Sequence, residues 1–202
     1  MIPTGVCDIH THNLHAPAGS AIVNIEPDAG PIPATPAGAL YSTGVHPWRS
    51  AEGAELWPLV ERLAADDRIA AIGEAGLDRL RGASLPEQIE LMERHARLAD
   101  SLAKPLSVHC VRAWAELLEL HRRLRPVQPW IIHGFRGAPA LAEQLLRAGM
   151  HISLGPRFNP ATAAAIPAGR LLLETDDDPT VSIEQVAAAV AAARASSAEL
   201  SN

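Results

Sequence analysis

Short apolar runs rich in β-branched residues recur along the chain, and segments with helical periodicity separate several of them. Each run is followed within a few residues by polar, Gly or Pro positions, which is typical of buried strands. The eight predicted strands are 6–10, 21–25, 39–45, 69–74, 106–110, 130–134, 151–155 and 171–175. Strands that alternate with helices predict a parallel sheet with helices outside it.

Segment 86–103 shows the helical pattern most clearly, because its apolar residues are spaced by three and four positions. These residues are Ile89, Met92, Ala96, Ala99 and Leu102. Ser84 and Glu87 form a capping-box sequence in front of the helix. The same spacing predicts four more helices. Their apolar positions are Leu56, Val60 and Leu63; Leu117, Leu118 and Leu124; Leu141, Leu145 and Ala148; and Ile183, Val186, Ala187 and Val190.

Two connections break this alternation. Segments 13–20 and 26–38 are rich in Ala, Pro and Gly and are predicted to be loops, and 156–169 has room for a short helix at most. Eight strands predict a TIM-like (β/α)8 barrel, a fold that typically needs about 250 residues, with about 200 near its minimum. With 202 residues, the chain is predicted to be one trimmed barrel domain, 1–202, with some helices missing or shortened. The alternative is an open doubly wound sheet.

Composition limits the classes of function. No apolar run approaches the roughly 20 residues of a membrane span, and the N-terminal segment lacks the basic and apolar regions of a signal peptide. The two cysteines are too few for a disulfide scaffold, so we expect reduced thiols and a cytoplasmic location. The net charge of -6 argues against a broad basic surface for nucleic acid, although local phosphate binding is still compatible with it.

Residues of metal-ligand type stand at or just past the C-terminal ends of the predicted strands, and they come from five different strands. They are His10, His12, Glu74, His109, His133 and Asp176. Barrel enzymes build their active sites at this end, so we expect the six side chains to converge. Imidazoles with carboxylates suit Zn or Mn, and a carboxylate can bridge two divalent cations. Mg is a third possibility, and the ligand types leave the native metal open.

Other polar residues near the same strand ends are candidates for binding substrate. His46 follows strand 39–45, Arg112 follows His109, and Arg136 lies in the loop after strand 130–134. These three are predicted to neutralise a phosphate or carboxylate of the substrate, and for His46 the alternative is to support the metal ligands. Among the remaining candidates, Cys110 is expected to serve in packing, and a role as a metal ligand is the alternative.

The other histidines divide by position. His95 and His121 fall inside predicted helices and are expected on the surface. His151 opens its strand at the opposite end and is expected to be structural. His15 lies in a predicted loop near the strand ends, where a role in the site is as plausible as none.

In these residues the chain resembles the TatD family of metal-dependent hydrolases. The matching stretches are DIHTH, GVHP, AIGEAGLD, PLSVH, IIHGFRG and LLLETD, in the family's order, between positions 8 and 176. The resemblance implies a TIM-like barrel in which His10, His12 and Asp176 hold one metal. His109 and His133 would hold the other, and Glu74 would bridge them. It also implies deoxyribonuclease activity at single-stranded ends, although some relatives hydrolyse other esters, including D-aminoacyl-tRNA.

The chain departs from the family pattern in two places. The connection from His12 to Gly44 is short, and the family's Pro-rich loop and Arg-Asn-x-Pro element after ETD are missing. Here ETDDDPTVSIEQ continues directly into the last predicted helix. Because that loop helps to shape the substrate site, nuclease specificity does not follow from the resemblance alone.

The leading hypothesis is a two-metal hydrolase that uses a metal-bound hydroxide to cleave a phosphodiester, with single-stranded DNA ends as substrate. Asp176 would orient the water and accept its proton, and Glu74 would act with it by bridging the metals. The second hypothesis is an amidohydrolase-like enzyme for a small ester or amide, or a D-aminoacyl-tRNA deacylase. The third is a non-catalytic metal-binding scaffold. No membrane and no obligate protein partner is expected.

Overall fold

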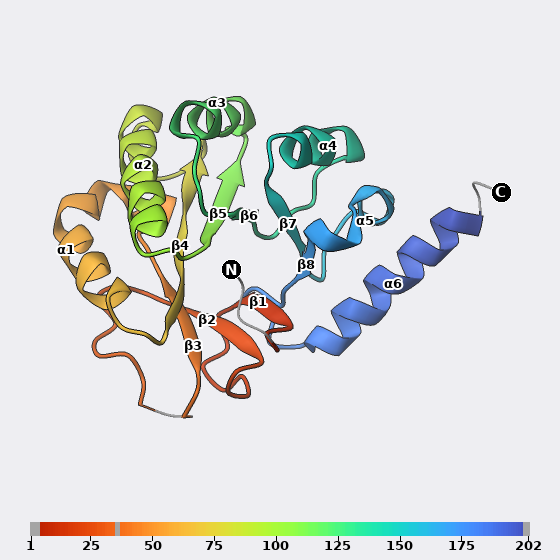
Figure 1. Cartoon of the computed structure of the whole chain (residues 1–202), viewed down its shortest axis with the longest axis horizontal. Helices are drawn as coiled ribbons and strands as arrows, with labels where there is room; N and C mark the ends of the chain where they lie inside the picture. The colour runs from red at the N-terminus through yellow and green to blue at the C-terminus, as the bar shows by residue number, and fades with distance from the viewer. Residues whose placement is uncertain (1–4, 35–36, 200–202) are drawn as a thin grey trace.

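Each of the predicted apolar runs forms a strand. The computed structural model describes residues 5–34 and 37–199. Within these residues eight parallel strands pair in chain order, β1 to β8. The strands are β1 (Asp8–Thr11), β2 (Ala21–Ile25), β3 (Leu40–Thr43), β4 (Ile69–Asp78), β5 (Leu106–Val111), β6 (Trp130–Ile132), β7 (His151–Leu154) and β8 (Leu171–Leu173). The arrangement is a barrel, and the open doubly wound sheet is excluded (Figure 1).

Helices form where the sequence has helical periodicity. The helices are η1 (Pro47–Glu52), α1 (Gly53–Ala64), α2 (Leu85–Ser101), α3 (Trp114–Leu124), α4 (Pro139–Arg147), α5 (Pro160–Ala165), η2 (Ala168–Arg170) and α6 (Ile183–Glu199). The capping box of α2 is present, because the Ser84 backbone N–H donates to Glu87 Oε2 at 3.0 Å. Figure 1 shows α1 to α4 around the outside of the strands and α6 extending to one side.

The barrel is trimmed, as predicted. Among the described residues no helix follows β1 or β2, and the short α5 and η2 alone connect β7 to β8. The predicted loop 26–38 includes residues 35–36, which lie outside the described residues. The strand ends in this part of the barrel are therefore linked by loops, and these loops border the cavity described below.

The barrel closes between β1 and β8 through few backbone contacts. An isolated parallel bridge joins Thr11 to Asp176, with hydrogen bonds from His12 N to Asp176 O and from Asp176 N to His10 O, each 3.0 Å. Below it, Thr175 Oγ1 donates to Asp8 Oδ2 at 2.6 Å. Burial raises the pKa of Asp8. The contacts that close the barrel therefore also place His10 and His12 beside Asp176.

The prediction that His95 lies on the surface is wrong. His95 is fully buried on the inner face of α2, where its Nδ1 donates to Leu91 O at 2.8 Å and its Nε2 accepts from Val45 N at 2.9 Å. Leu91 is four residues before His95 and shares its helix face, a spacing that marks the position as inward. The ring therefore joins α2 to the loop after β3, which carries His46.

Burial of this ring predicts acid sensitivity. Burial lowers the pKa of His95 to about 4, from an ordinary value of 6.5. Between these two values the unfolded chain binds a proton that the folded chain excludes, so stability is complete above pH 6.5 and falls as the pH drops toward 4. At about 1.4 kcal/mol per pKa unit, we expect His95 to account for a loss of about 3 kcal/mol.

Urea unfolding of the wild type and His95→Gln at several pH values between 4.5 and 7.5 measures this effect. The wild type is expected to lose stability more steeply than the variant as the pH falls, because all other titrating groups are shared. Parallel pH curves for the two proteins would contradict the prediction.

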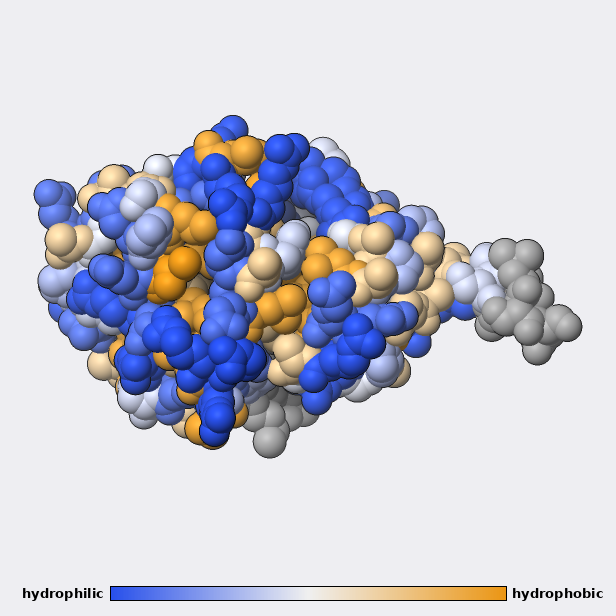
Figure 2. Space-filling model, turned by 90° about the horizontal axis from the view of Figure 1, so that it is seen from above, coloured by the Kyte–Doolittle hydropathy of each residue, from blue (hydrophilic) through white to orange (hydrophobic). Residues whose placement is uncertain are grey.

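None of the described helices combines the length and the apolar composition needed to cross a bilayer. On the face shown in Figure 2, hydrophobic side chains form small patches separated by hydrophilic ones.

Candidate metal centre

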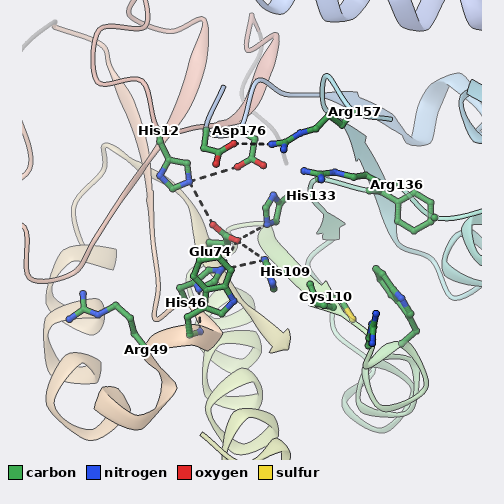
Figure 3. Close-up of a pocket in the computed structure, with 18 of the residues that line it drawn as sticks. His12, His46, Arg49, Glu74, His109, Cys110, His133, Arg136, Arg157 and Asp176 are labelled. Carbon is green, nitrogen blue, oxygen red and sulfur yellow. Dashed lines mark hydrogen bonds and ion pairs between the residues drawn. The ribbon is translucent and has the colours of Figure 1, made fainter. Parts of the chain in front are cut away.

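The six predicted ligands meet at the C-terminal ends of the strands. Five of them line a cavity of about 1250 Å³, and they are His12, Glu74, His109, His133 and Asp176. His10 is fully buried directly beneath it. Figure 3 shows the side chains of Glu74 and its neighbours pointing toward one another from separate strands. Residues up to 166 positions apart in sequence are thus brought to one place by the parallel topology.

Two glycines allow β4 to carry Glu74 into this position. A Cβ at Gly73 would lie 2.4 Å from Ser107 O, and a Cβ at Gly76 would lie 1.9 Å from His109 O. A side chain at either position would push β4 away from β5. The sequence AIGEAGLD therefore permits the close strand approach that places Glu74 against His109.

One oxygen of the Glu74 carboxylate faces three imidazoles. Glu74 Oε1 lies 2.7 Å from His133 Nε2, 3.0 Å from His109 Nδ1 and 3.1 Å from His46 Nε2. His109 and His133 are the pair that the family resemblance assigns to one metal. Their nitrogens and this oxygen are close enough for a shared cation to replace the direct contacts.

The other oxygen faces the histidine pair of β1. Glu74 Oε2 lies 3.3 Å from His10 Nε2 and 3.8 Å from His12 Nε2. Asp176 Oδ1 lies 4.0 Å and 3.9 Å from the same two nitrogens. The two oxygens of Glu74 thus separate the histidines into the two groups that a bridging carboxylate requires.

The donor atoms fit divalent cations. Among the described residues, three overlapping groups have donor atoms within 4.8 Å of one another. They are His10, His12 and Glu74; His10, His133 and Asp176; and His46, Glu74 and His109. The buried Nε2 of His10 has no hydrogen-bond partner in the described chain, and it lies beside Glu74 Oε2 and Asp176 Oδ1. An unpaired imidazole nitrogen beside carboxylate oxygens matches the preferences of Zn and Mn. Which residues ligate which ion stays a prediction.

The carboxylates around His133 favour a proton on this predicted metal ligand. Burial raises the pKa of Glu74, but His133, His10 and His109 together lower it well below its ordinary value. Burial likewise lowers the pKa of His133, but Glu74 and Glu174 raise it well above 6.5. A protonated imidazole cannot ligate a metal, so cation uptake at His133 must release a proton.

His46 lies closer to Glu74 and His109 than expected for a residue that only contacts substrate. Its Nδ1 accepts a hydrogen bond from Trp48 N at 3.2 Å at the start of η1, so the ring proton of the neutral form is on Nε2. That nitrogen faces Glu74 and lies 3.4 Å from His109 Nδ1. The arrangement therefore makes His46 a hydrogen-bond donor toward the reacting region, although its position is within ligand distance.

The predicted arginines lie on the cavity wall. Arg112 and Arg136 both line the cavity, and within the described ranges neither guanidinium has a hydrogen-bond or ion-pair partner. Sequence reasoning missed two further arginines there. Arg157 pairs with Asp177 at 3.2 Å, and Arg49 is bound by three carboxylates, with a bidentate contact to Asp28 at 2.8 and 2.9 Å. Arg112 and Arg136 are therefore available to bind an anion.

Several buried polar groups behind the ligands were also missed. Glu174 Oε1 lies 3.5 Å from His133 Nδ1 and accepts from Gly134 N at 2.6 Å. Ser107 Oγ lies 3.3 Å from His10 Nδ1. Glu174 stands two residues before Asp176, the same spacing as in the histidine pair of β1, and this spacing could have identified it.

The remaining candidates stand apart from the centre. Cys110 lines the cavity and packs against the core, and burial raises the pKa of its thiol to about 12. These features agree with the predicted role of Cys110 in packing. His15 is exposed on a loop and does not line the cavity. His121 is half-buried against the Trp130 ring rather than on the surface. His151 begins β7 at the end away from the centre.

Comparisons with known proteins agree with the geometry. Residues 34–199 match the family described as TatD related DNase. The chain is 35% identical over 162 residues to the 3'-5' ssDNA/RNA exonuclease TatD of Cronobacter turicensis, covering 69% of this chain and 57% of that protein. It is 33% identical over 151 residues to a metal-dependent hydrolase TatD of Mycobacterium tuberculosis, covering 68% and 56%. The chain thus spans less than two thirds of these relatives.

Solved structures have the same fold. A TatD family hydrolase from Entamoeba histolytica superposes with a TM-score of 0.59 at 26% identity, over 73% of this chain and 54% of that one. YJJV, a TatD homologue from Escherichia coli K12, superposes with a TM-score of 0.71 at 22% identity, over 88% and 78%. Because YJJV is only 22% identical to this chain, its similarity supports the trimmed barrel fold and no further property.

Proposed function

Because this chain belongs to the TatD family, we propose that it is a two-metal hydrolase that cleaves phosphodiester bonds at the ends of single-stranded DNA. One observation carries the proposal: each carboxylate oxygen of Glu74 faces its own group of imidazoles. A carboxylate between two ligand groups can bridge the two cations of a two-metal centre. The relatives named as 3'-5' ssDNA/RNA exonucleases support the choice of substrate.

The metal ligands proposed here follow the split around Glu74. His10, His12 and Asp176 would hold one ion, and His109 and His133 would hold the other, with Glu74 shared. Bound Zn, Mn or Mg supplies Lewis-acid chemistry, which lowers the pKa of water and stabilises charge on phosphoryl oxygens.

The chain's own side chains handle the proton and the substrate. The Asp176 carboxylate is partly exposed to the cavity, and its backbone is hydrogen-bonded on both sides to β1, so it can orient an attacking water and accept its proton. The Nε2–H of His46 is directed to donate to an oxygen of the scissile group. Arg112 and Arg136 supply unpaired guanidiniums for the neighbouring phosphates.

The cavity wall also suits a nucleotide chain. Trp48 and Trp114 line it together with the arginines, and Trp48 is 49% exposed. Aromatic rings stack on bases without regard to sequence, and arginines hold the backbone. Arg112 and Arg136 have no carboxylate partner in the described residues, so on a chain with a net charge of -6 they are the cavity groups that would attract a polyanion.

Hydrolysis of labelled single-stranded DNA by metal-stripped protein tests the proposal, with Mg²⁺, Mn²⁺ or Zn²⁺ restored separately. We expect release of nucleotides that needs a restored metal and that stops when the 3′ end is blocked. Metal binding at about two ions per chain without release of nucleotides from any DNA would overturn the DNA substrate. In that case small esters, amides and D-aminoacyl-tRNA become the substrates to test.

A further inference from the structure

Asp78, which ends β4, connects a proposed metal ligand to the cavity wall. Its side chain is 3% exposed. Oδ2 accepts a hydrogen bond from Trp48 Nε1 at 2.7 Å and lies 3.5 Å from His109 Nε2. Oδ1 accepts from Leu80 N at 2.7 Å. One carboxylate oxygen thus faces both the indole of an exposed cavity residue and the ring of His109.

The position of Asp78 is itself fixed from α2. Gln88, 2% exposed, accepts from Asp78 N at 2.7 Å with its Oε1. Its Nε2 donates at 2.9 Å to the carbonyl oxygens of Asp78, Arg81 and Ala83. The turn after β4 is therefore tied to the helix, and the carboxylate cannot shift away without breaking buried hydrogen bonds.

Each ring nitrogen of His109 faces a carboxylate. Its Nδ1 faces Glu74 Oε1 at 3.0 Å and His46 Nε2 at 3.4 Å, and its Nε2 is buried with Asp78 as the acceptor that faces it. An ionised carboxylate only accepts hydrogen bonds, so Glu74 favours a proton on Nδ1 and Asp78 favours a proton on Nε2. A cation at Nδ1 would take the place of the proton there, and the single proton of the neutral ring would then lie on Nε2, facing Asp78.

We propose that Asp78 is a positioning residue that accepts the Nε2 proton of His109 when Nδ1 is presented to a cation. The same carboxylate holds the Trp48 indole against the cavity wall. This inference rests on the proposed role of His109 as a metal ligand, within the proposed two-metal function. Carboxylates that accept from a ligating histidine commonly set the orientation and basicity of its ring.

The first test is spectroscopic and needs no substrate. NMR of histidine-labelled, Zn²⁺-loaded protein detects the imidazole N–H protons, and His109→Gln identifies the His109 signal by its loss. We expect His109 to show an Nε2–H proton shifted downfield by its carboxylate acceptor, and Asp78→Asn to move that signal upfield. An Nε2–H signal that is the same in Asp78→Asn as in the wild type would overturn the inference.

The second test measures Mn²⁺ binding by calorimetry. Asp78→Asn is expected to weaken one of two sites between about 10- and 100-fold, while the site of His10, His12 and Asp176 keeps its affinity. Trp48→Phe is the matched control, because it removes the indole hydrogen bond and leaves the carboxylate, and it should bind Mn²⁺ as the wild type does. Unchanged affinity in both sites of Asp78→Asn, or equal loss in Trp48→Phe, would contradict the proposal. Absence of Mn²⁺ binding in the wild type would instead count against the proposed function.

Discussion

Glu74→Gln is expected to reduce hydrolysis by about 10³-fold or more and to remove tight binding of two ions. The amide has one oxygen and one NH₂ group, so it cannot offer an anionic oxygen to each of the two histidine groups that face Glu74. Lewis-acid stabilisation is worth several kcal/mol, and about 1.4 kcal/mol corresponds to a tenfold change in rate. Calorimetric titration with Mn²⁺ and rates on labelled DNA measure the two effects.

Glu61→Gln is the matched control for that variant. Glu61 is an exposed residue of α1, and its substitution by Gln makes the same chemical change away from the cavity. It should keep the metal affinity and the rate. Circular dichroism on both variants separates loss of the centre from loss of the fold. Two-ion binding of wild-type strength in Glu74→Gln would show that Glu74 is not the shared ligand.

Asp176→Asn is expected to lower kcat between about 10²- and 10⁴-fold, even at saturating metal, because an amide cannot accept the proton of the attacking water. The side chain of Asp176 is 20% exposed and its φ is 55°, a conformation that asparagine tolerates. Its two hydrogen bonds to β1 come from backbone atoms and survive the substitution. The barrel closure is therefore retained while the proton acceptor is lost.

The neighbouring Asp177 provides the control for this prediction. Its side chain is 68% exposed and forms a surface ion pair with Arg157. Asp177 also lines the cavity but belongs to none of the groups of potential metal ligands, so Asp177→Asn should change kcat by less than about fivefold. Steady-state kinetics with separate kcat and KM values distinguish the two. Equal, small losses in both variants would exclude Asp176 as the proton acceptor.

Much of the fold could be read from local pattern. The positions of all eight strands follow from short apolar runs, and α2 follows from periodicity and its capping box. The pattern also gave the meeting place of the ligands. In parallel strands every C-terminal end points to the same side, so residues that follow separate runs must come together.

Other features depend on contacts that no local pattern contains. β4 runs four residues further than its apolar run, to Asp78, because β5 pairs with it along that length. His95 is polar in an amphipathic helix, and its burial depends on Val45 N, fifty residues earlier, as the partner that makes burial tolerable. The burial of Glu174 likewise depends on a partner distant in sequence, because its Oε1 lies 3.5 Å from His133 Nδ1.

The sequence by itself thus determined the number and positions of the strands, the trimmed connections and the identity of the ligand-type residues, because these depend on composition and spacing along the chain. Only the tertiary structure decided which Glu74 oxygen faces which histidine, that His46 directs its Nε2 inward, and that Asp78 stands behind His109. These facts depend on strand register and rotamers, which are set by packing between residues distant in sequence, and a change of one position in register would turn each side chain to the opposite face.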